Sequence, residues 1–162
     1  MKFRVSDDQK SRHQNIRSYL EGDSASIAVV FSAIDLEWTI RRVLDKIIGS
    51  SKISEVKQIA GLNAYEKAWN EFAIPKGFPK LSFINPKWNE IKKDYQLRHD
   101  IVHGRVGTTS AKYADQRVND LLGASVAITE AASKQGFNPY RKLKKANFAG
   151  PTKKGDHQPS EE

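Results

Sequence analysis

The clearest regular pattern in the chain lies between Ser24 and Gly49, where apolar side chains recur at helical spacing. These apolar positions are Ile27, Val30, Phe31, Ile34, Trp38, Val43, Leu44, Ile47 and Ile48. Side chains three or four residues apart lie on one face of a helix, so the pattern predicts a long amphipathic helix. Ser24 suits its N-cap and Gly49 suits its C-terminal end. We predict that this helix forms the centre of the core.

Helical spacing also occurs in four other stretches that glycine and proline residues separate. They cover residues 7–20, 53–72, 86–104 and 111–136. The expected N-caps are Ser6, Asn85 and Ser110, and the second stretch is expected to break near Gly61. The short connection between the last two helices predicts that they are antiparallel neighbours.

No window of the chain shows the sustained alternation of a half-buried strand, although we interpret residues 80–86 (KLSFINP) as a short extended piece. The sequence therefore predicts an all-α fold, a bundle of about five helices with a long central helix. We expect one domain over residues 1–135. Residues 136–162 contain several glycines and prolines and few aliphatic residues, which predicts a flexible tail.

Composition excludes several classes of protein. The chain has 162 residues and no cysteine, so it forms no disulfide and no thiolate metal site. Its N-terminus lacks the apolar core of a signal peptide, and no run reaches the ~18 apolar residues of a membrane span. We therefore expect a cytoplasmic protein that does not associate with a membrane.

The net charge of +8 favours an anionic partner such as RNA or DNA. Residues 136–162 hold six Lys or Arg against three Asp or Glu, which leaves +5 for residues 1–135. The dense basic cluster of the tail consists of Arg141, Lys142, Lys144 and Lys145. We interpret this cluster as a candidate contact to an RNA backbone, and the alternative is a solvated tail without a ligand.

The most reactive set of side chains lies in residues 98–103, which read RHDIVH and precede Gly104. Histidine exchanges protons near neutral pH, and arginine presents a permanent forked cation that suits phosphate oxygens. Arg98 and His103 are five residues apart, which places them about 140° apart around a regular helix. Either the helix end unwinds and turns His103, or a second copy of the chain completes the site. Asp100 is positioned to orient the imidazole of His103.

Arg98, His99 and His103 match the arginine, polar residue, three variable residues and histidine of ribonucleases in the HEPN superfamily. The stretch AIDLEWTIRRVL, residues 33–44, resembles the acidic early helix of that family, with Glu37 at the acidic position. The VHG ending before a capped last helix extends the resemblance to residues 24–135. The chain thus resembles the HEPN superfamily of small helical domains.

The resemblance implies a homodimeric endoribonuclease that cleaves RNA without a metal or another cofactor, with a composite active site at the dimer interface. Arg98 would hold the phosphate, and His103 would act as general base or general acid. His99, Asp100 and Glu37 would support them, and Arg105 would contact the substrate. Such a protein is plausibly a toxin or defence effector that an inhibitory partner or antitoxin restrains.

Alternative interpretations stay open. Cationic side chains also complement the dipole at a helix C-terminus, and His99 and His103 have the spacing of two zinc ligands. Glu37 can pair with Arg41 instead of a site residue. We interpret His13 and His157 as incidental. The whole chain can also be a non-catalytic HEPN-like module that binds RNA, a nucleotide or a protein partner.

Overall fold

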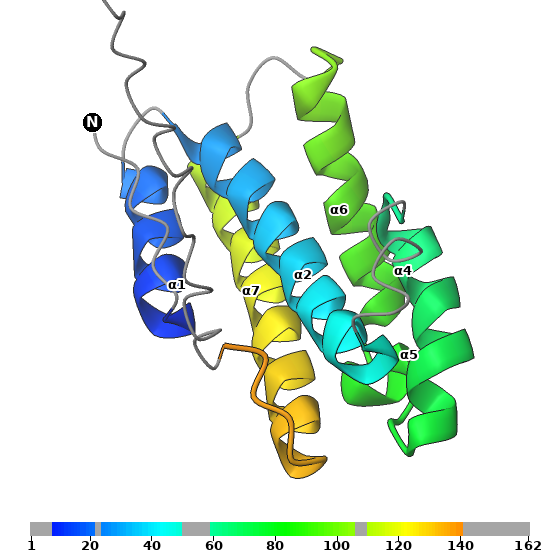
Figure 1. Cartoon of the computed structure of the whole chain (residues 1–162). Coiled ribbons are helices and arrows are strands. Elements are labelled where there is room, and N and C mark those ends of the chain that lie inside the picture. Colours follow the sequence, from blue (N-terminus) through cyan, green and yellow to red (C-terminus); the bar gives the residue numbers. More distant parts are fainter. Residues whose placement is uncertain (1–7, 22–23, 50–58, 106–109, 141–162) are drawn as a thin grey trace, which may run out of the picture.

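The computed structural model describes residues 8–21, 24–49, 59–105 and 110–140, and the regular elements in these ranges are all helical (Figure 1). The α-helices are α1 (Gln9–Ser18), α2 (Ala25–Ile48), α4 (Leu62–Ala68), α5 (Leu81–Ile84), α6 (Trp88–Val102) and α7 (Ala111–Lys134). The helical turns are η1 (Tyr19–Glu21), η3 (Trp69–Ala73) and η4 (Ile74–Lys76). The prediction of an all-α fold is confirmed.

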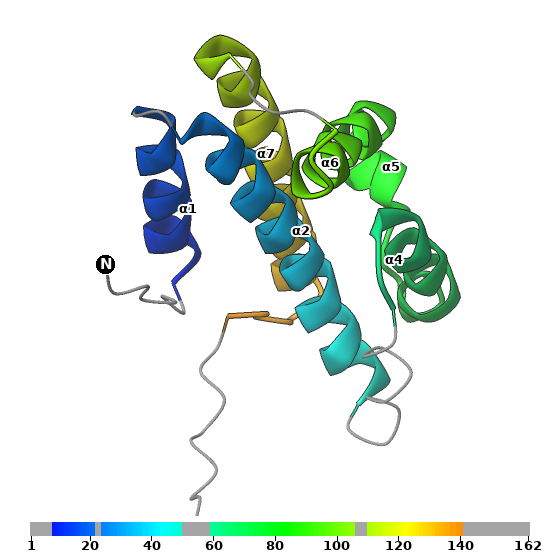
Figure 2. The ribbon, with the colours of Figure 1, turned by 90° about the horizontal axis from the view of Figure 1, so that it is seen from above.

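The centre of the fold is the pair α2 and α7, which contact each other more extensively than any other two helices. Seen from above, α1 covers one side of this pair, while α4, α5 and α6 lie on the other side (Figure 2). Helices α6 and α7 run antiparallel (Figure 1). No helix within the described ranges combines the length and the apolarity that a membrane span requires.

Two groups of buried apolar side chains hold the helices together. The larger group joins α2 to α4, η3, α5, α6 and α7, and its biggest members are Trp69, Trp88, Leu36, Ile40, Leu44, Leu81, Ile91, Leu121 and Ile128. The smaller group joins α1 to α2 and α7 around Ile16, Val29, Val118 and Leu122. Full burial of a large aliphatic side chain stabilises a fold by about 1.5–3 kcal/mol, so the larger group contributes most of the driving force.

The bounds predicted for the central helix are confirmed, since α2 covers Ala25–Ile48 and Gly49 follows it. The predicted buried face is partly wrong. Ile27 and Ile34 are both 42% exposed, whereas Ala28 and Ala33 are fully buried. Helix α2 is packed against neighbours on several sides, and close packing against α7 requires small side chains that a pattern of large apolar residues does not include.

Several helix ends differ from the sequence prediction. Helix α1 is capped by Asp8, whose carboxylate accepts a hydrogen bond of 2.8 Å from Ser11 N, and the expected cap Ser6 lies outside the described residues. Helix α6 begins at Trp88, two residues after Pro86. The Asn85 side chain accepts from Lys87 N and so caps the turn before α6.

The interpretation of residues 80–86 as extended is wrong, because Leu81–Ile84 forms the short helix α5. The amides of Phe83 and Ile84 donate hydrogen bonds to the carbonyl oxygen of Lys80, which closes a single helical turn. Leu81 is buried in the larger core group, so this turn is held by its packing. A single helical turn is too short to produce a recognisable pattern of apolar residues.

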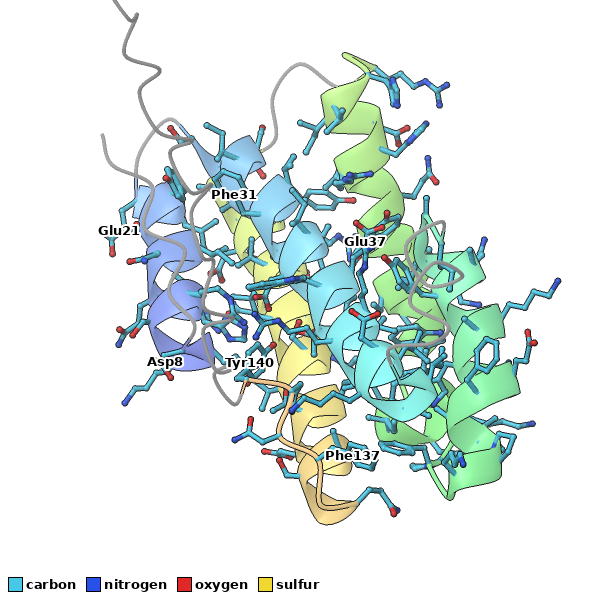
Figure 3. The ribbon with its side chains drawn as sticks, in the orientation of Figure 1. Asp8, Glu21, Phe31, Glu37, Phe137 and Tyr140 are labelled. Carbon is cyan, nitrogen blue, oxygen red and sulfur yellow. The ribbon has the colours of Figure 1, made fainter. Side chains whose placement is uncertain are left out.

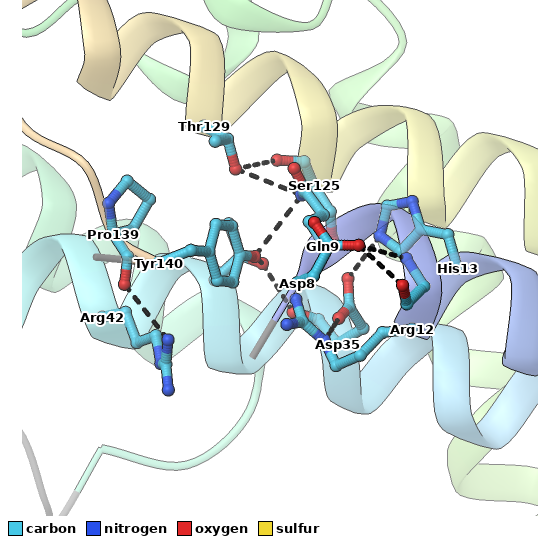
Figure 4. Close-up of polar contacts among 12 residues, drawn as sticks. Asp8, Gln9, Arg12, His13, Asp35, Arg42, Ser125, Thr129, Pro139 and Tyr140 are labelled. Atoms are coloured by element: carbon cyan, nitrogen blue, oxygen red, sulfur yellow. Dashed lines mark hydrogen bonds and ion pairs between the residues drawn. The ribbon is translucent and has the colours of Figure 1, made fainter. Parts of the chain in front are cut away.

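A buried polar network fastens α1 to the central helices (Figure 4). The carboxylate of Asp35, on α2, accepts a hydrogen bond of 2.9 Å from Arg12 Nε, and His13 Nε2 lies 2.9 Å from its other oxygen. Attraction and hydrogen bonding from His13 and Arg12 hold the Asp35 pKa below its usual value, although burial alone would raise it. His13 is therefore a structural residue that helps to hold α1 on α2, and its interpretation as incidental to function stays a prediction.

Residues 136–140 also pack on the bundle. Phe137 packs against the larger core group, and its ring centroid lies 5.7 Å from that of Phe78. The Tyr140 hydroxyl shares a hydrogen bond with Thr39, and the guanidinium of Arg12 lies 4.5 Å from the Tyr140 ring centroid (Figure 4). The packed chain thus continues beyond residue 135, the domain end that the sequence suggested.

Candidate functional site

The RHDIVH motif occupies the last turn and a half of α6. Residues 98–102 are helical, His103 is the C-cap, and Gly104 has a φ of 66° that favours glycine. The amides of Gly104 and Arg105 donate to the carbonyl oxygens of Ile101 and Asp100, at 3.1 and 2.8 Å. These two bonds form a Schellman ending, which closes the helix tightly.

The two histidines of the motif lie together on one face of α6. Their ring centroids are 4.2 Å apart, and the amide of His103 donates a hydrogen bond of 3.0 Å to the carbonyl oxygen of His99. His103 is exposed and His99 is half-buried. The pair therefore presents one imidazole to solvent with a second imidazole in contact behind it.

Arg98 does not join this pair. The helix stays regular up to His103, so the expected unwinding that would turn His103 toward Arg98 does not occur. No hydrogen bond or ring contact connects Arg98 to His103 in the described part of the chain. The two side chains therefore leave α6 in different directions.

Arg98 is half-buried on the side of α6 that faces α2. Its guanidinium carbon lies 5.7 Å from the centroid of the Tyr95 ring, within the range of a cation–π interaction. Arg98 Nε is fully buried without a hydrogen-bond partner among the described residues. The two terminal nitrogens of Arg98 are not buried in this way. The terminal nitrogens are thus the part of the guanidinium that is open to a ligand.

Glu37 lies between α2 and α6 (Figure 3) and accepts a hydrogen bond from the hydroxyl of Tyr95. Burial, together with this hydrogen bond and the Glu37 charge, raises the Tyr95 pKa far above its usual value, so the phenol stays protonated. No ion pair between Glu37 and Arg41 occurs in the described ranges. Glu37 is thus bonded to the tyrosine whose ring lies against Arg98.

Sequence reasoning missed the role of Tyr95, which bonds to Glu37 of α2 and carries its ring against Arg98 of the motif. Tyr95 precedes Arg98 by three positions, and side chains at this spacing lie on one helix face. That spacing was the signal that could have identified it. The partner of its hydroxyl comes from another helix and only the tertiary structure reveals it.

Asp100 does not orient His103 as expected. Its carboxylate lies 3.6 Å from Arg105 Nη1 and accepts a hydrogen bond of 3.3 Å from the side chain of Gln96. Arg105, which the sequence suggested as a substrate contact, is exposed and is paired with this carboxylate at the helix end. A pair this exposed is weak, and the role of Arg105 as a substrate contact stays a prediction.

The described ranges contain no group of three or more His, Asp or Glu side chains that would hold a metal ion. The basic cluster of Arg141, Lys142, Lys144 and Lys145 lies outside the described residues. No family model matches the chain, and comparisons with curated proteins and with solved structures find no match. Membership of the HEPN superfamily stays a prediction from the sequence pattern.

Proposed function

We propose that this chain is a metal-independent endoribonuclease whose active site lies at the C-terminal end of α6. The observation that carries the proposal is the exposed imidazole of His103, in contact with His99, at the helix end that also holds Arg98. A proton-transferring group and an anion-binding group on one helix end are the two parts that phosphodiester cleavage requires. The net charge of +8 supports an anionic substrate.

In the proposed reaction, the imidazole of His103 takes the proton from a ribose 2′-hydroxyl. The 2′-oxygen then attacks the adjacent phosphorus, and the bond from phosphorus to the 5′-oxygen of the next nucleotide breaks. The 5′-oxygen takes a proton from water, which leaves a 2′,3′-cyclic phosphate and a 5′-hydroxyl, and the imidazolium of His103 returns its proton to the solvent. Arg98 stabilises the negative charge that grows on the phosphate oxygens. DNA lacks the attacking hydroxyl, so this chemistry is restricted to RNA.

The proposal includes a homodimer in which Arg98 of one protomer works with His103 of the other. The regular end of α6 supports it, because Arg98 and His103 leave one helix in different directions. Exposed apolar side chains on α6 and α2 support it as well: Val102 of α6 is 55% exposed, and Ile27 and Ile34 of α2 are each 42% exposed. A role as a toxin or defence effector that a protein partner restrains belongs to the same proposal.

The test is cleavage of labelled single-stranded RNA in EDTA, with DNA of the same sequence beside it. We expect cleavage of RNA alone, with a loss of about 100-fold or more in His103→Ala and in Arg98→Ala. Lys93→Ala is the control, since it removes an exposed cation from the same helix. His103→Ala should change the free energy of unfolding by no more than about 0.5 kcal/mol, because its side chain is exposed.

Mixing the two inactive variants tests the composite site. A dimer of one Arg98→Ala chain and one His103→Ala chain contains one intact site if the two residues come from different protomers, and none if they come from the same protomer. Restored cleavage therefore supports the composite site. Binding of RNA without cleavage by the wild-type chain would refute the nuclease and favour the non-catalytic RNA-binding module.

A further inference from the structure

The Arg98 guanidinium is held by an arrangement that spans two helices. On α2, Glu37 accepts a hydrogen bond from Tyr95 of α6, and the Tyr95 ring lies under the Arg98 guanidinium at 5.7 Å. The Arg98 side chain makes no hydrogen bond or ion pair to another described residue. The Tyr95 ring is thus the aromatic partner of Arg98 among the described residues.

We propose that Tyr95 is the positioning residue of the anion site, because its ring, fixed by Glu37, holds Arg98 with Nε inward and the terminal nitrogens outward. An unrestrained arginine samples many rotamers, and the entropy lost on binding a phosphate weakens the interaction. A side chain that is already oriented avoids that loss. The ring attracts the cation without occupying any of its five N–H donors, so the donors stay available to an anion.

The hydroxyl of Tyr95 explains why this residue is a tyrosine. A phenylalanine would supply the same ring face, but only the hydroxyl bonds to the Glu37 carboxylate and fixes the ring against α2. The Glu37 charge and the Arg98 charge both act on the Tyr95 hydroxyl, the first raising and the second lowering the Tyr95 pKa, so the three groups lie together at the interface of α2 and α6. In this proposal, Glu37 of α2 acts on the anion site through Tyr95.

The first arm of the test is nuclear magnetic resonance of the arginine Nε–Hε groups, which does not depend on any enzymatic activity. Arg98→Lys identifies the Arg98 signal. Because Arg98 Nε is buried, its hydrogen should exchange slowly with water in the wild-type chain and in Tyr95→Phe. In Tyr95→Leu we expect the exchange to accelerate about tenfold or more. Tyr113→Leu is the control: the Tyr113 ring also lies against an arginine, Arg117 at 4.5 Å, but on α7, so its loss should leave the Arg98 signal unchanged. Unlike Arg98, Arg117 also donates a hydrogen bond to the tyrosine hydroxyl.

The second arm measures RNA cleavage and rests on the proposed function. We expect kcat/KM to fall about three- to thirtyfold in Tyr95→Leu and less in Tyr95→Phe, which keeps the ring. Addition of Arg98→Ala to Tyr95→Leu should cost no more than Arg98→Ala alone, because both changes remove the same interaction. Circular dichroism establishes that each variant is folded.

The two arms distinguish a failure of the positioning role of Tyr95 from a failure of the proposed nuclease function. An unchanged Arg98 signal in a folded Tyr95→Leu protein would overturn the positioning role, whether or not the chain cleaves RNA. Losses from Tyr95→Leu and Arg98→Ala that simply add in the cleavage assay would overturn it as well. A wild-type chain that does not cleave RNA refutes the nuclease and leaves the first arm to decide the role of Tyr95.

Discussion

The buried carboxyl of Asp94 predicts a stability that falls as the pH rises from about 4 to about 6. Its side chain is fully buried on α6, and Arg117 Nη1 of α7 lies 2.6 Å from one of its oxygens. Burial raises the Asp94 pKa from 3.8 to about 6, because removal from water outweighs the attraction of Arg117. The charges of Asp120 and Glu90 raise it further.

The size of the effect follows from this pKa shift. Between pH 3.8 and about 6, the folded state holds a proton on Asp94 that the unfolded state has lost. The folded state binds more protons in this window, so the free energy of unfolding falls as the pH rises. A shift of about two pKa units at roughly 1.4 kcal/mol each makes this loss about 3 kcal/mol.

The perturbation is Asp94→Asn, and the assay is urea denaturation followed by circular dichroism at pH 4, 5, 6 and 7. The quantity to compare is the free energy of unfolding of the wild type minus that of the variant, because the titration of all other groups cancels. This difference should fall by about 2.4 kcal/mol from pH 4 to pH 7, since a small part of the loss occurs below pH 4. Asp115→Asn, an exposed carboxylate on α7, is the control and should show a constant difference. A constant difference for Asp94→Asn too, or one that grows with pH, would refute the argument.

Two further predictions concern the polar network around α1. Asp35→Asn should lower the free energy of unfolding at pH 7 by about 3–5 kcal/mol in urea denaturation, because it removes the buried carboxylate that pairs with Arg12 and His13. The Asp35 pKa is lowered, so its contribution should disappear as the pH falls below about 4, and a wild-type advantage that persists at pH 2 would contradict this assignment. Tyr140→Phe should lower stability by about 1 kcal/mol through loss of the hydroxyl bond to Thr39, and Tyr140→Ala should cost more because it also removes the ring from Arg12. Equal melting temperatures for the two Tyr140 variants would show that the ring does not contribute.

The candidate site illustrates which contacts local sequence can predict. The motif at 98–103 was recognisable because its chemistry is contained in six consecutive residues, and the end of α6 at Gly104 was recognisable because glycine favours a positive φ. The partners of these residues in the folded chain could not be recognised from the local sequence. Asp100 pairs with Arg105 and Gln96 at the helix surface, and Glu37 bonds to Tyr95, 58 residues away along the chain.

By itself, the sequence determined the all-α class, the bounds of the long central helix and the Ser110 cap of α7, because helical periodicity and capping depend on residues within about one turn of each other. Only the tertiary structure decided which face of α2 is buried, why His13 and Asp35 are buried together, and where Glu37 acts. The physical reason is that burial and polar pairing depend on which helices become neighbours. That choice results from the packing of the whole bundle, which no local window of the chain contains.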